Sequence, residues 1–584
     1  MPRNNYKKQN NNGPTKHRLN ILKNLALIAL AIIVVRLFFI QIIEHNAWVA
    51  KANEQHTLLE AITAKRGEIY MMDHGEPVAI VLNQTAYQIV IDPTVTQKED
   101  IEKVVNTYAK EYQTADIDEI YSQEGLRYAI VAKNIPRAIA EKIAESETPA
   151  VWLKKTNQRV YPEGEFASGL LGFVNNDGVG QYGVEGSLNK ALAGENGLIK
   201  TTSDINNVAL SIGKDNVKIP AKDGQNIILS IDRSLEKGTE ELASEAINNT
   251  AATNASVLIL NPNNGKVLTM ANLPNYNPNE YSSVTDAAIF NNYVTDVPYE
   301  PASICKNFAF SAAINEGKMT PDTTFFNQHY EVVDDWKIWN AEQRSSLYGT
   351  LTMRDALYWS LNTGSIHALK LLGDDPTHIN QQGREKLFDY YYNKFRLGHT
   401  TGVELNEAEG FIPDPNEGWG RDSTYANLTF GQNLSITMLQ TATAFSAVVN
   451  GGTWRTPSIL EDNPTQERVE DKILSDETSA MMREMLIHNR SYKVRQGIDR
   501  AGYDIGGKSG TAQVIRNGAY DDSFAELVGS YIGFVGTSGE MPSYVIMVKM
   551  WGEGQSIGSG DAMSLFDKIS NYMIDYMKIK PGGV

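Results

Sequence analysis

The stretch YEPASICKNFAFSAAINEG, residues 299–317, carries the pattern on which the interpretation of this chain depends. Pro301 and Ser303 are residue types that favour the start of a helix, and Gly317 favours its end. A helix that begins here places Lys306 one turn after Ser303 and on the same face. A serine hydroxyl is a good nucleophile only when a base takes its proton, and a lysine serves when burial and a second cation lower its pKa. Taken alone, however, the pair is better explained as a capping serine and a solvated lysine.

A second short motif, Ser360-Leu361-Asn362, follows within the stretch DALYWSLNTGSIHALKLLG. The apolar positions on both sides predict a helix, a turn and a second helix. A hydroxyl at such a turn can pass a proton between a lysine and a leaving amine. An asparagine amide can hold a substrate carbonyl and a lysine at once. The alternative is a turn whose side chains only cap backbone groups.

The third motif lies in GGKSGTAQV, which has the pattern of a strand and contains Lys508, Ser509, Gly510 and Thr511. We expect Lys508 to be the second cation near Lys306. Hydroxyls along an edge strand suit an extended substrate that carries a carboxylate, and glycine lets a backbone approach closely. The alternative is an ordinary exposed strand with glycine at a bulge. Each motif is weak by itself, and their order and spacing favour one catalytic site.

The sequence pattern of the remaining residues predicts a multidomain protein of the α/β (α+β) class. After residue 220 a strand, an amphipathic helix and a hairpin precede a helix-rich middle and a final group of strands. This order predicts an antiparallel sheet covered by helices. Residues 44–62 have a helical pattern, and an elongated mixed domain follows them. The expected boundaries are a basic tail at 1–24, a membrane span at 25–43, a mixed domain at 44–220 and a catalytic domain at 221–584.

The apolar run Leu25 to Ile43 has 19 residues, which as a helix would be about 28 Å long and could cross a bilayer. Basic residues before the run and Glu44 after it predict a single span with the N-terminus in the cytoplasm and the catalytic domain outside it. A cleaved signal peptide and a buried soluble helix are the alternatives. Arg36 lies inside the run and is our candidate for a contact with a membrane partner.

Composition argues against several kinds of partner and site. The net charge of -17 argues against a nucleic-acid partner. Cys305 is the single cysteine of the chain, so neither an intramolecular disulfide nor a cysteine-cluster zinc site can form.

The three ordered motifs are typical of penicillin-binding proteins and serine β-lactamases. Longer stretches extend the similarity over nearly all of residues 20–584, and the chain resembles a class B penicillin-binding protein, a monofunctional peptidoglycan D,D-transpeptidase. These stretches include RGEIY (66–70), RVYPEGEFASGLLGFV (159–174), GVEGSLNKALAGENG (183–197), VLTMANLPNYNPNEY (267–281) and LTFGQNLSITMLQ (428–440).

The resemblance implies roles for the catalytic side chains. Ser303 attacks the bond between two D-alanines of a stem peptide, and Lys306 acts as its base. Ser360 and Lys508 relay the proton to the leaving D-alanine, and Asn362 positions Lys306 and the substrate. Residues 44–220 become a pedestal, or dimerisation-type, domain, and residues 221–584 become the transpeptidase domain.

The resemblance also implies how the substrate is held. The backbone amides of Ser303 and Thr511 form an oxyanion hole, while Ser509, Gly510 and Thr511 bind the substrate. Neither a metal nor a cofactor is implied. The expected partners are stem peptides, lipid-linked or on nascent glycan, with β-lactams as inhibitors, a membrane glycosyltransferase and division proteins.

Three positions depart from the common family pattern. Ala302 stands where glycine is usual, and Cys305 stands where Thr, Val or Phe is commoner. The third motif is KSG rather than KTG. Every reactive group is retained. Cys305 fits a small buried hydrophobe, although it would make the site sensitive to thiol reagents if it were accessible.

Four functions remain in competition. The stretches SLNTG and GQNLSIT favour a septal, division-specific transpeptidase over the elongation-specific type. A β-lactamase or β-lactam sensor is disfavoured by the span and by the large domain before residue 220. A non-catalytic scaffold is disfavoured because the set of reactive residues is intact.

Overall fold

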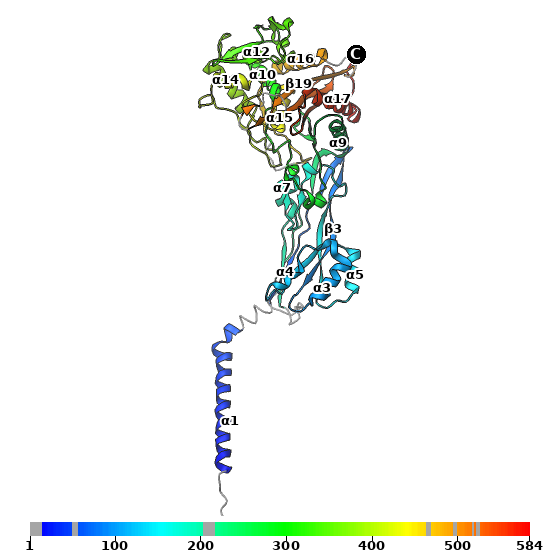
Figure 1. Ribbon diagram of the computed structural model, residues 1–584, viewed down its shortest axis with the longest axis vertical. Helices are drawn as coiled ribbons and strands as arrows, with labels where there is room; N and C mark the ends of the chain where they lie inside the picture. The colour runs from blue at the N-terminus through cyan, green and yellow to red at the C-terminus, as the bar shows by residue number, and fades with distance from the viewer. Residues whose placement is uncertain are drawn as a thin grey trace, which may run out of the picture. The chain divides into compact units, whose positions relative to one another are not determined.

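The computed structural model describes residues 15–48, 57–202, 217–462, 469–493, 499–516, 519–520 and 526–583 (Figure 1). The chain forms two compact units. One joins residues 1–64 with 195–223, and the other joins 65–194 with 224–584.

The first unit contains the apolar helix α1 (Thr15–Phe38), which continues as the π-helix η1 (Phe39–Ile43). Its apolar side chains are exposed on all sides, as expected for a helix surrounded by lipid, and it is long enough for a single-pass anchor. The helical expectation for residues 44–62 is wrong at its end, because Thr57–Ile62 is strand β1. It pairs antiparallel with β8 (Gly197–Thr202), and this long-range pairing overrides the local pattern.

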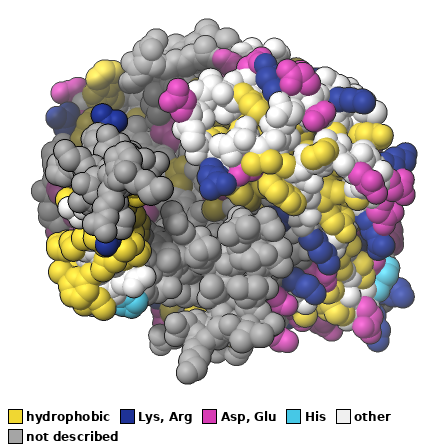
Figure 2. Space-filling model, turned by 90° about the horizontal axis from the view of Figure 1, so that it is seen from below, with side chains coloured by type: hydrophobic (Ala, Val, Ile, Leu, Met, Phe, Trp, Pro, Cys, Tyr) yellow, Lys and Arg dark blue, Asp and Glu magenta, His cyan; other side chains and the backbone are white. Residues whose placement is uncertain are grey.

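In the second unit, residues before 233 form the pedestal sheet in the order β10-β2-β3-β4, with β5 also paired to β3. The alternating stretch Tyr87–Asp92 places Ile89 and Ile91 in a core under α3 and α5, as its period of two predicts. The face in Figure 2 carries acidic, basic and hydrophobic side chains interspersed. The bounds are β2 Ile69–Asp73, β3 Glu76–Ile91, α3 Lys98–Val104, α4 Ile117–Ser122, β4 Ala129–Pro136, α5 Arg137–Glu145, β5 Val151–Val160, α6 Ser168–Leu171, α7 Gly183–Ser187 and β10 Ile227–Asp232.

A buried ionic cluster joins three pedestal stretches that are far apart in sequence. Glu185 is fully buried and accepts from Arg66 Nε at 2.7 Å and from Arg159 Nε at 2.6 Å. Arg66 also donates to Asn189 Oδ1 at 2.8 Å, and Arg159 donates to the Gly67 carbonyl at 2.7 Å. The two guanidinium groups thus share one carboxylate and also donate to neutral oxygens, while Arg159 Nη2 is buried without a hydrogen-bond partner among the described residues.

The sheet that carries the third motif has the strand order β12-β11-β23-β22-β19 and is antiparallel throughout. Alternate residues of these strands face two different cores. One core lies under α9 and α17. The other lies under the central helices α10 (Lys306–Asn315), α12 (Asn362–Leu372) and α15 (Met438–Val449). The predicted hairpin and final helix are both present (Figure 1). The bounds are α9 Arg233–Asn248, β11 Asn254–Leu260, β12 Val267–Leu273, β19 Tyr503–Gln513, β22 Leu527–Thr537, β23 Tyr544–Trp551 and α17 Ser559–Tyr576.

The central helices carry the first two motifs. The predicted helix at 301–317 is a 3-10 turn, η6 (Ala302–Cys305), followed by α10 (Lys306–Asn315), whose first nine residues are buried. The predicted helix–turn–helix is α11 (Met353–Tyr358) and α12 (Asn362–Leu372). Beside them lie α14 (Asp422–Leu428), α15 (Met438–Val449) and α16 (Asp476–Lys493).

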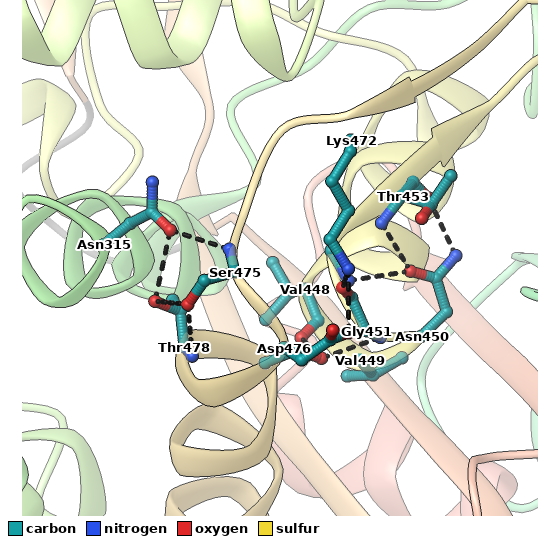
Figure 3. Close-up of polar contacts among 12 residues, drawn as sticks. Asn315, Val448, Val449, Asn450, Gly451, Thr453, Lys472, Ser475, Asp476 and Thr478 are labelled. Carbon is teal, nitrogen blue, oxygen red and sulfur yellow. Dashed lines mark hydrogen bonds and ion pairs between the residues drawn. The ribbon is translucent and has the colours of Figure 1, made fainter.

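A polar network holds α10 and α16 together near their ends (Figure 3). Asn315 Oδ1 accepts from the Ser475 amide at 2.8 Å and from Thr478 Oγ1 at 3.2 Å. Farther along α16, Asn489 Nδ2 donates to the Gly507 carbonyl of β19 at 2.6 Å. Helix α16 therefore links the helix of the first motif to the strand of the third.

Candidate functional site

The Ser303 turn brings a hydroxyl and an amine together. Lys306 Nζ lies 3.0 Å from Ser303 Oγ, because the 3-10 turn places the two side chains on one side. Lys306 is fully buried, whereas Ser303 is partly exposed at the surface of the site. An amine held in this way is within reach of the hydroxyl proton.

Residues of the second motif surround the same amine. Lys306 Nζ donates to Asn362 Oδ1 at 2.8 Å and to the Ser360 carbonyl at 2.6 Å, and it lies 3.2 Å from Ser360 Oγ. Ser360 has a left-handed φ of 56°, which turns the chain sharply between α11 and α12. Asn362 is the first residue of α12, so the helix fixes its backbone.

Lys508 approaches Ser360 from the sheet. Its Nζ lies 2.9 Å from Ser360 Oγ and 3.0 Å from the Ser509 carbonyl, and the side chain is almost fully buried. Ser360 Oγ is therefore within hydrogen-bond distance of two lysine amines, one from each motif. This arrangement connects Ser303 to Lys508 through Lys306 and Ser360.

Strand β19 is the edge of its sheet and lies against the Ser303 turn. A Cβ on Gly510 would lie 2.5 Å from the Pro301 carbonyl, so glycine permits this approach. Ser509 is partly exposed and Thr511 is exposed, and both lie on the other face of the strand from Lys508. Alternate N–H groups of an edge strand point away from the sheet and can receive a ligand.

The residue before Ser303 has an unusual backbone. Ala302 has a left-handed φ of 51°, a conformation in which glycine is far less strained than alanine. Its amide donates to the Gly431 carbonyl at 3.2 Å. A Cβ on Gly431 would lie 2.1 Å from the Ala302 carbonyl, so this second glycine shapes the turn.

The sequence interpretation did not assign two neighbours of the site. One is Gly431, which lies inside the quoted stretch LTFGQNLSITMLQ and whose glycine was a usable signal. The other is Trp339, whose carbonyl accepts from Asn362 Nδ2 at 2.8 Å. A backbone carbonyl leaves no sequence signal, because any residue type supplies it.

Cys305 is fully buried beneath the site, and its carbonyl accepts from Tyr391 Oη at 3.1 Å. Burial raises the pKa of the Cys305 thiol, which disfavours the reactive thiolate. The position therefore acts as a small hydrophobe in the core.

Similarity to known proteins was found over most of the chain. Residues 255–571 match the family of the penicillin binding protein transpeptidase domain, and residues 61–229 match the penicillin-binding protein dimerisation domain. The peptidoglycan D,D-transpeptidase FtsI of Buchnera aphidicola is 27% identical over 573 residues, covering 97% of this chain and 96% of that protein. Stage V sporulation protein D of Bacillus subtilis is 28% identical, covering 92% of this chain and 82% of that protein.

Solved structures share the fold. Penicillin-binding protein 3 of Mycobacterium tuberculosis, complexed with aztreonam, matches with a TM-score of 0.63 and 22% identity over 90% of this chain and 98% of that one. Penicillin-binding protein PBP2 of Helicobacter pylori, in complex with MreC, matches with a TM-score of 0.70 and 19% identity over 90% of this chain and 99% of that one.

Proposed function

The chain belongs to the penicillin-binding protein transpeptidase family, as a class B serine D,D-transpeptidase of cell-wall synthesis, and we propose that Ser303 is its nucleophile and Lys306 its base. The observation that carries this proposal is the 3.0 Å approach of Lys306 Nζ to Ser303 Oγ. Lys508 and Ser360 complete a path for the proton. Asn362 holds Lys306 in place through its side-chain oxygen.

In the first half-reaction Ser303 Oγ attacks the carbonyl carbon of the bond between two D-alanines. Lys306 takes the hydroxyl proton as the new C–O bond forms. The C–N bond then breaks, and the leaving D-alanine amine receives a proton through Ser360 Oγ, with Lys508 on its other side. This half-reaction leaves the stem peptide as an ester on Ser303 and releases free D-alanine.

Backbone and edge-strand groups stabilise that step. The amides of Ser303 and Thr511 would hold the oxyanion of the tetrahedral intermediate. Ser509 and Thr511 would bind the terminal carboxylate, with Gly510 allowing the substrate backbone to lie against β19.

In the second half-reaction an amine from another stem peptide attacks the ester and loses its proton to the same path. Ser303 Oγ leaves with a proton, and the two peptides are joined. A β-lactam acylates Ser303 and remains bound, because the ring-opened product keeps its leaving group attached.

A fluorescent penicillin tests this assignment on the full-length chain in detergent. Wild type should form a covalent adduct that survives denaturation, and Ser303→Ala should form none. A mass shift on a peptide containing Ser303 locates the bond. Failure of folded wild type to label would contradict the proposal, and rapid release of hydrolysed penicillin would favour a β-lactamase or sensor.

The membrane layout is proposed from the sequence boundaries. Residues 1–24 would be cytoplasmic, 25–43 would span the membrane, 44–220 would form the pedestal and 221–584 the transpeptidase domain outside the cytoplasm, except that β10 (Ile227–Asp232) pairs with pedestal strand β2. The substrate would be a stem peptide on nascent or lipid-linked glycan, supplied by a separate membrane glycosyltransferase. Arg36 is the proposed contact with that partner. Charge reversal by Arg36→Glu should abolish complex formation, and an intact complex would exclude this role.

We also propose a septal rather than an elongation role. The motif environments SLNTG and GQNLSIT support it, as does similarity to proteins named FtsI. A complex with division proteins follows from that role. Depletion in the native bacterium should produce filaments, and rounded cells would instead indicate the elongation role.

A further inference from the structure

A short hairpin beside the site carries an exposed strip of aromatic and aliphatic side chains. It is formed by β14 (Tyr330–Val333) and β15 (Trp336–Trp339), with Tyr330 opposite Trp339 and Val332 opposite Lys337. Side chains that lie opposite each other, or two residues apart, share one face of a hairpin. We call this face, made by Tyr330, Val332, Lys337 and Trp339, the hairpin face.

The hairpin face is preorganised and open to solvent. The ring centroids of Tyr330 and Trp339 lie 4.8 Å apart at an interplanar angle of 45°. Lys337 Nζ lies 4.9 Å from the Tyr330 ring and 5.8 Å from the Trp339 ring. The exposed fraction is 46% for Trp339 and 54% for Val332. Two adjoining rings with a cation beside them form a surface typical of ligand recognition.

The side chains of the hairpin face are not needed to pack the hairpin onto the domain. The opposite face of the same hairpin already supplies the packing, because Val333 is buried and Ile338 packs against the main core. Glu331, on that opposite face, accepts from Lys370 of α12 at 3.1 Å. The hairpin is therefore held through Val333, Ile338 and Glu331, although Trp336 on that same face is also 72% exposed.

The hairpin face adjoins the catalytic residues. The Trp339 carbonyl accepts from Asn362 Nδ2 at 2.8 Å, and the other side-chain atom of this amide accepts from Lys306. The next residue, Asn340, accepts from the Thr363 amide at 3.0 Å and so holds the end of the hairpin to the start of α12. One amide group separates the hairpin backbone from the catalytic ammonium.

We propose that the hairpin face binds the sugar strand to which the stem peptide is attached. This inference rests on the proposed function, because the substrate there is a peptide linked to an amino-sugar polymer. An extended peptide spans at most about 3.6 Å per residue, so a stem peptide of a few residues keeps its sugar near Ser303 during acylation. Pyranose rings present C–H faces that stack on indole and phenol rings. Lys337 supplies a cation for the carboxylates near the sugar–peptide junction.

Binding of glycan strands without stem peptides tests the proposal directly. An amidase removes the peptides and leaves a carboxylate on every second sugar. The full-length chain in detergent is titrated with such strands, and affinity is measured by intrinsic tryptophan fluorescence. The test variants are Tyr330→Ala and Lys337→Glu. The matched control is Trp152→Ala, which removes an exposed tryptophan, 52% exposed, from pedestal strand β5.

Each test variant should weaken glycan binding at least ten-fold, and Trp152→Ala should leave it within two-fold of wild type. Lys337 is exposed, so Lys337→Glu is compatible with folding even if Tyr330→Ala is not. Penicillin labelling of Ser303 is measured on every variant. Wild type that labels but binds no glycan, or test variants that bind glycan like wild type, would overturn the proposal. The second result would point to a protein partner on this face. Loss of labelling in wild type would instead contradict the proposed function.

Discussion

Two buried clusters of this protein each contain two basic side chains. The clusters differ in the group that lies between those side chains. In the pedestal, Arg66 and Arg159 share the carboxylate of Glu185. In the catalytic site, Lys306 and Lys508 converge on the hydroxyl of Ser360, with Lys306 also donating to the Asn362 amide oxygen. One cluster places a full negative charge between its cations, and the other places a neutral hydroxyl there.

This difference suits one cluster to stabilising the fold and the other to moving a proton. A carboxylate between two guanidinium groups holds both charges firmly and leaves no group ready to move a proton. A hydroxyl between two lysine amines can accept a hydrogen bond from one amine and donate elsewhere, so it can relay a proton. The pedestal cluster should therefore determine folding, and the catalytic cluster should determine rate.

The largest expected effect is on the rate of acylation. Lys306→Met keeps the volume of the side chain and removes the base. The rate of penicillin acylation should fall by about 10²–10⁴-fold, the usual contribution of a positioned base. The free energy of unfolding should change by less than about 1 kcal/mol, because losing the hydrogen bonds of the amine and removing a buried polar group have opposing effects. Stopped-flow labelling and thermal unfolding in detergent measure the two quantities, and a variant that acylates at the wild-type rate would show that Lys306 is not the base.

A substitution in the pedestal cluster should lower stability and leave the acylation rate unchanged. Glu185→Gln leaves two buried guanidinium groups without a compensating charge, and should destabilise the protein by about 3–5 kcal/mol. Penicillin acylation per folded molecule should be unchanged. Thermal unfolding of the full-length chain in detergent measures the loss.

A partly exposed pair provides the control for that prediction. Glu163 accepts from Arg233 Nε at 2.7 Å, but 25% and 28% of these side chains remain exposed. Glu163→Gln should therefore cost no more than about 1 kcal/mol. Equal losses in Glu185→Gln and Glu163→Gln would mean that burial does not distinguish the two pairs.

A third buried basic side chain, Lys549 of β23, extends the comparison. Aromatic rings surround its amine, in place of a carboxylate or a hydroxyl. Its Nζ lies 4.2 Å from the Tyr299 ring centroid and 4.6 Å from that of Trp551. Burial lowers the pKa of Lys549 to about 7. Between this pKa and the ordinary value of about 10.4 the unfolded chain binds one proton more than the folded chain, so stability rises with pH across that window.

Lys549→Met should remove this dependence. Between pH 7 and 9 the wild type should gain up to about 1.4 kcal/mol per pH unit relative to the variant, and the variant should be the more stable at pH 7. Thermal unfolding of both proteins across this range gives the difference. Parallel stability curves would show that Lys549 does not titrate in this window.

The elements with a local pattern were predictable from the sequence. The strand at Tyr87–Asp92, the hairpin of β11 and β12, and helices α9 and α17 follow from periods of two and 3.6 residues. The membrane helix follows from its apolar run, which contains two polar residues, Arg36 and Gln41. Residues 57–62 were assigned to a helix because their pairing partner lies more than 130 residues away, at β8, and leaves no local pattern.

The proposed catalytic side chains were identified for a different reason. Their types and order repeat a family pattern, and the structure brings Ser303, Lys306, Ser360, Asn362 and Lys508 into one hydrogen-bonded chain. Backbone groups such as the Trp339 carbonyl could not be found, because no residue type encodes them. The pedestal cluster was missed because Arg66, Arg159 and Glu185 were read as parts of separate stretches, and only folding brings them together.

The smallest expected effect compares two alanines with left-handed backbones, one in each region. Ala302 precedes the nucleophile with a φ of 51°, and Ala167 precedes Ser168 in the pedestal with a φ of 52°. Glycine adopts this conformation with little strain, while its greater freedom in the unfolded chain offsets part of the gain. Ala302→Gly and Ala167→Gly should each therefore stabilise the protein by up to about 1 kcal/mol. Thermal unfolding measures both, and a loss of stability in Ala302→Gly alone would show that the catalytic turn depends on contacts of the Ala302 methyl group rather than storing backbone strain.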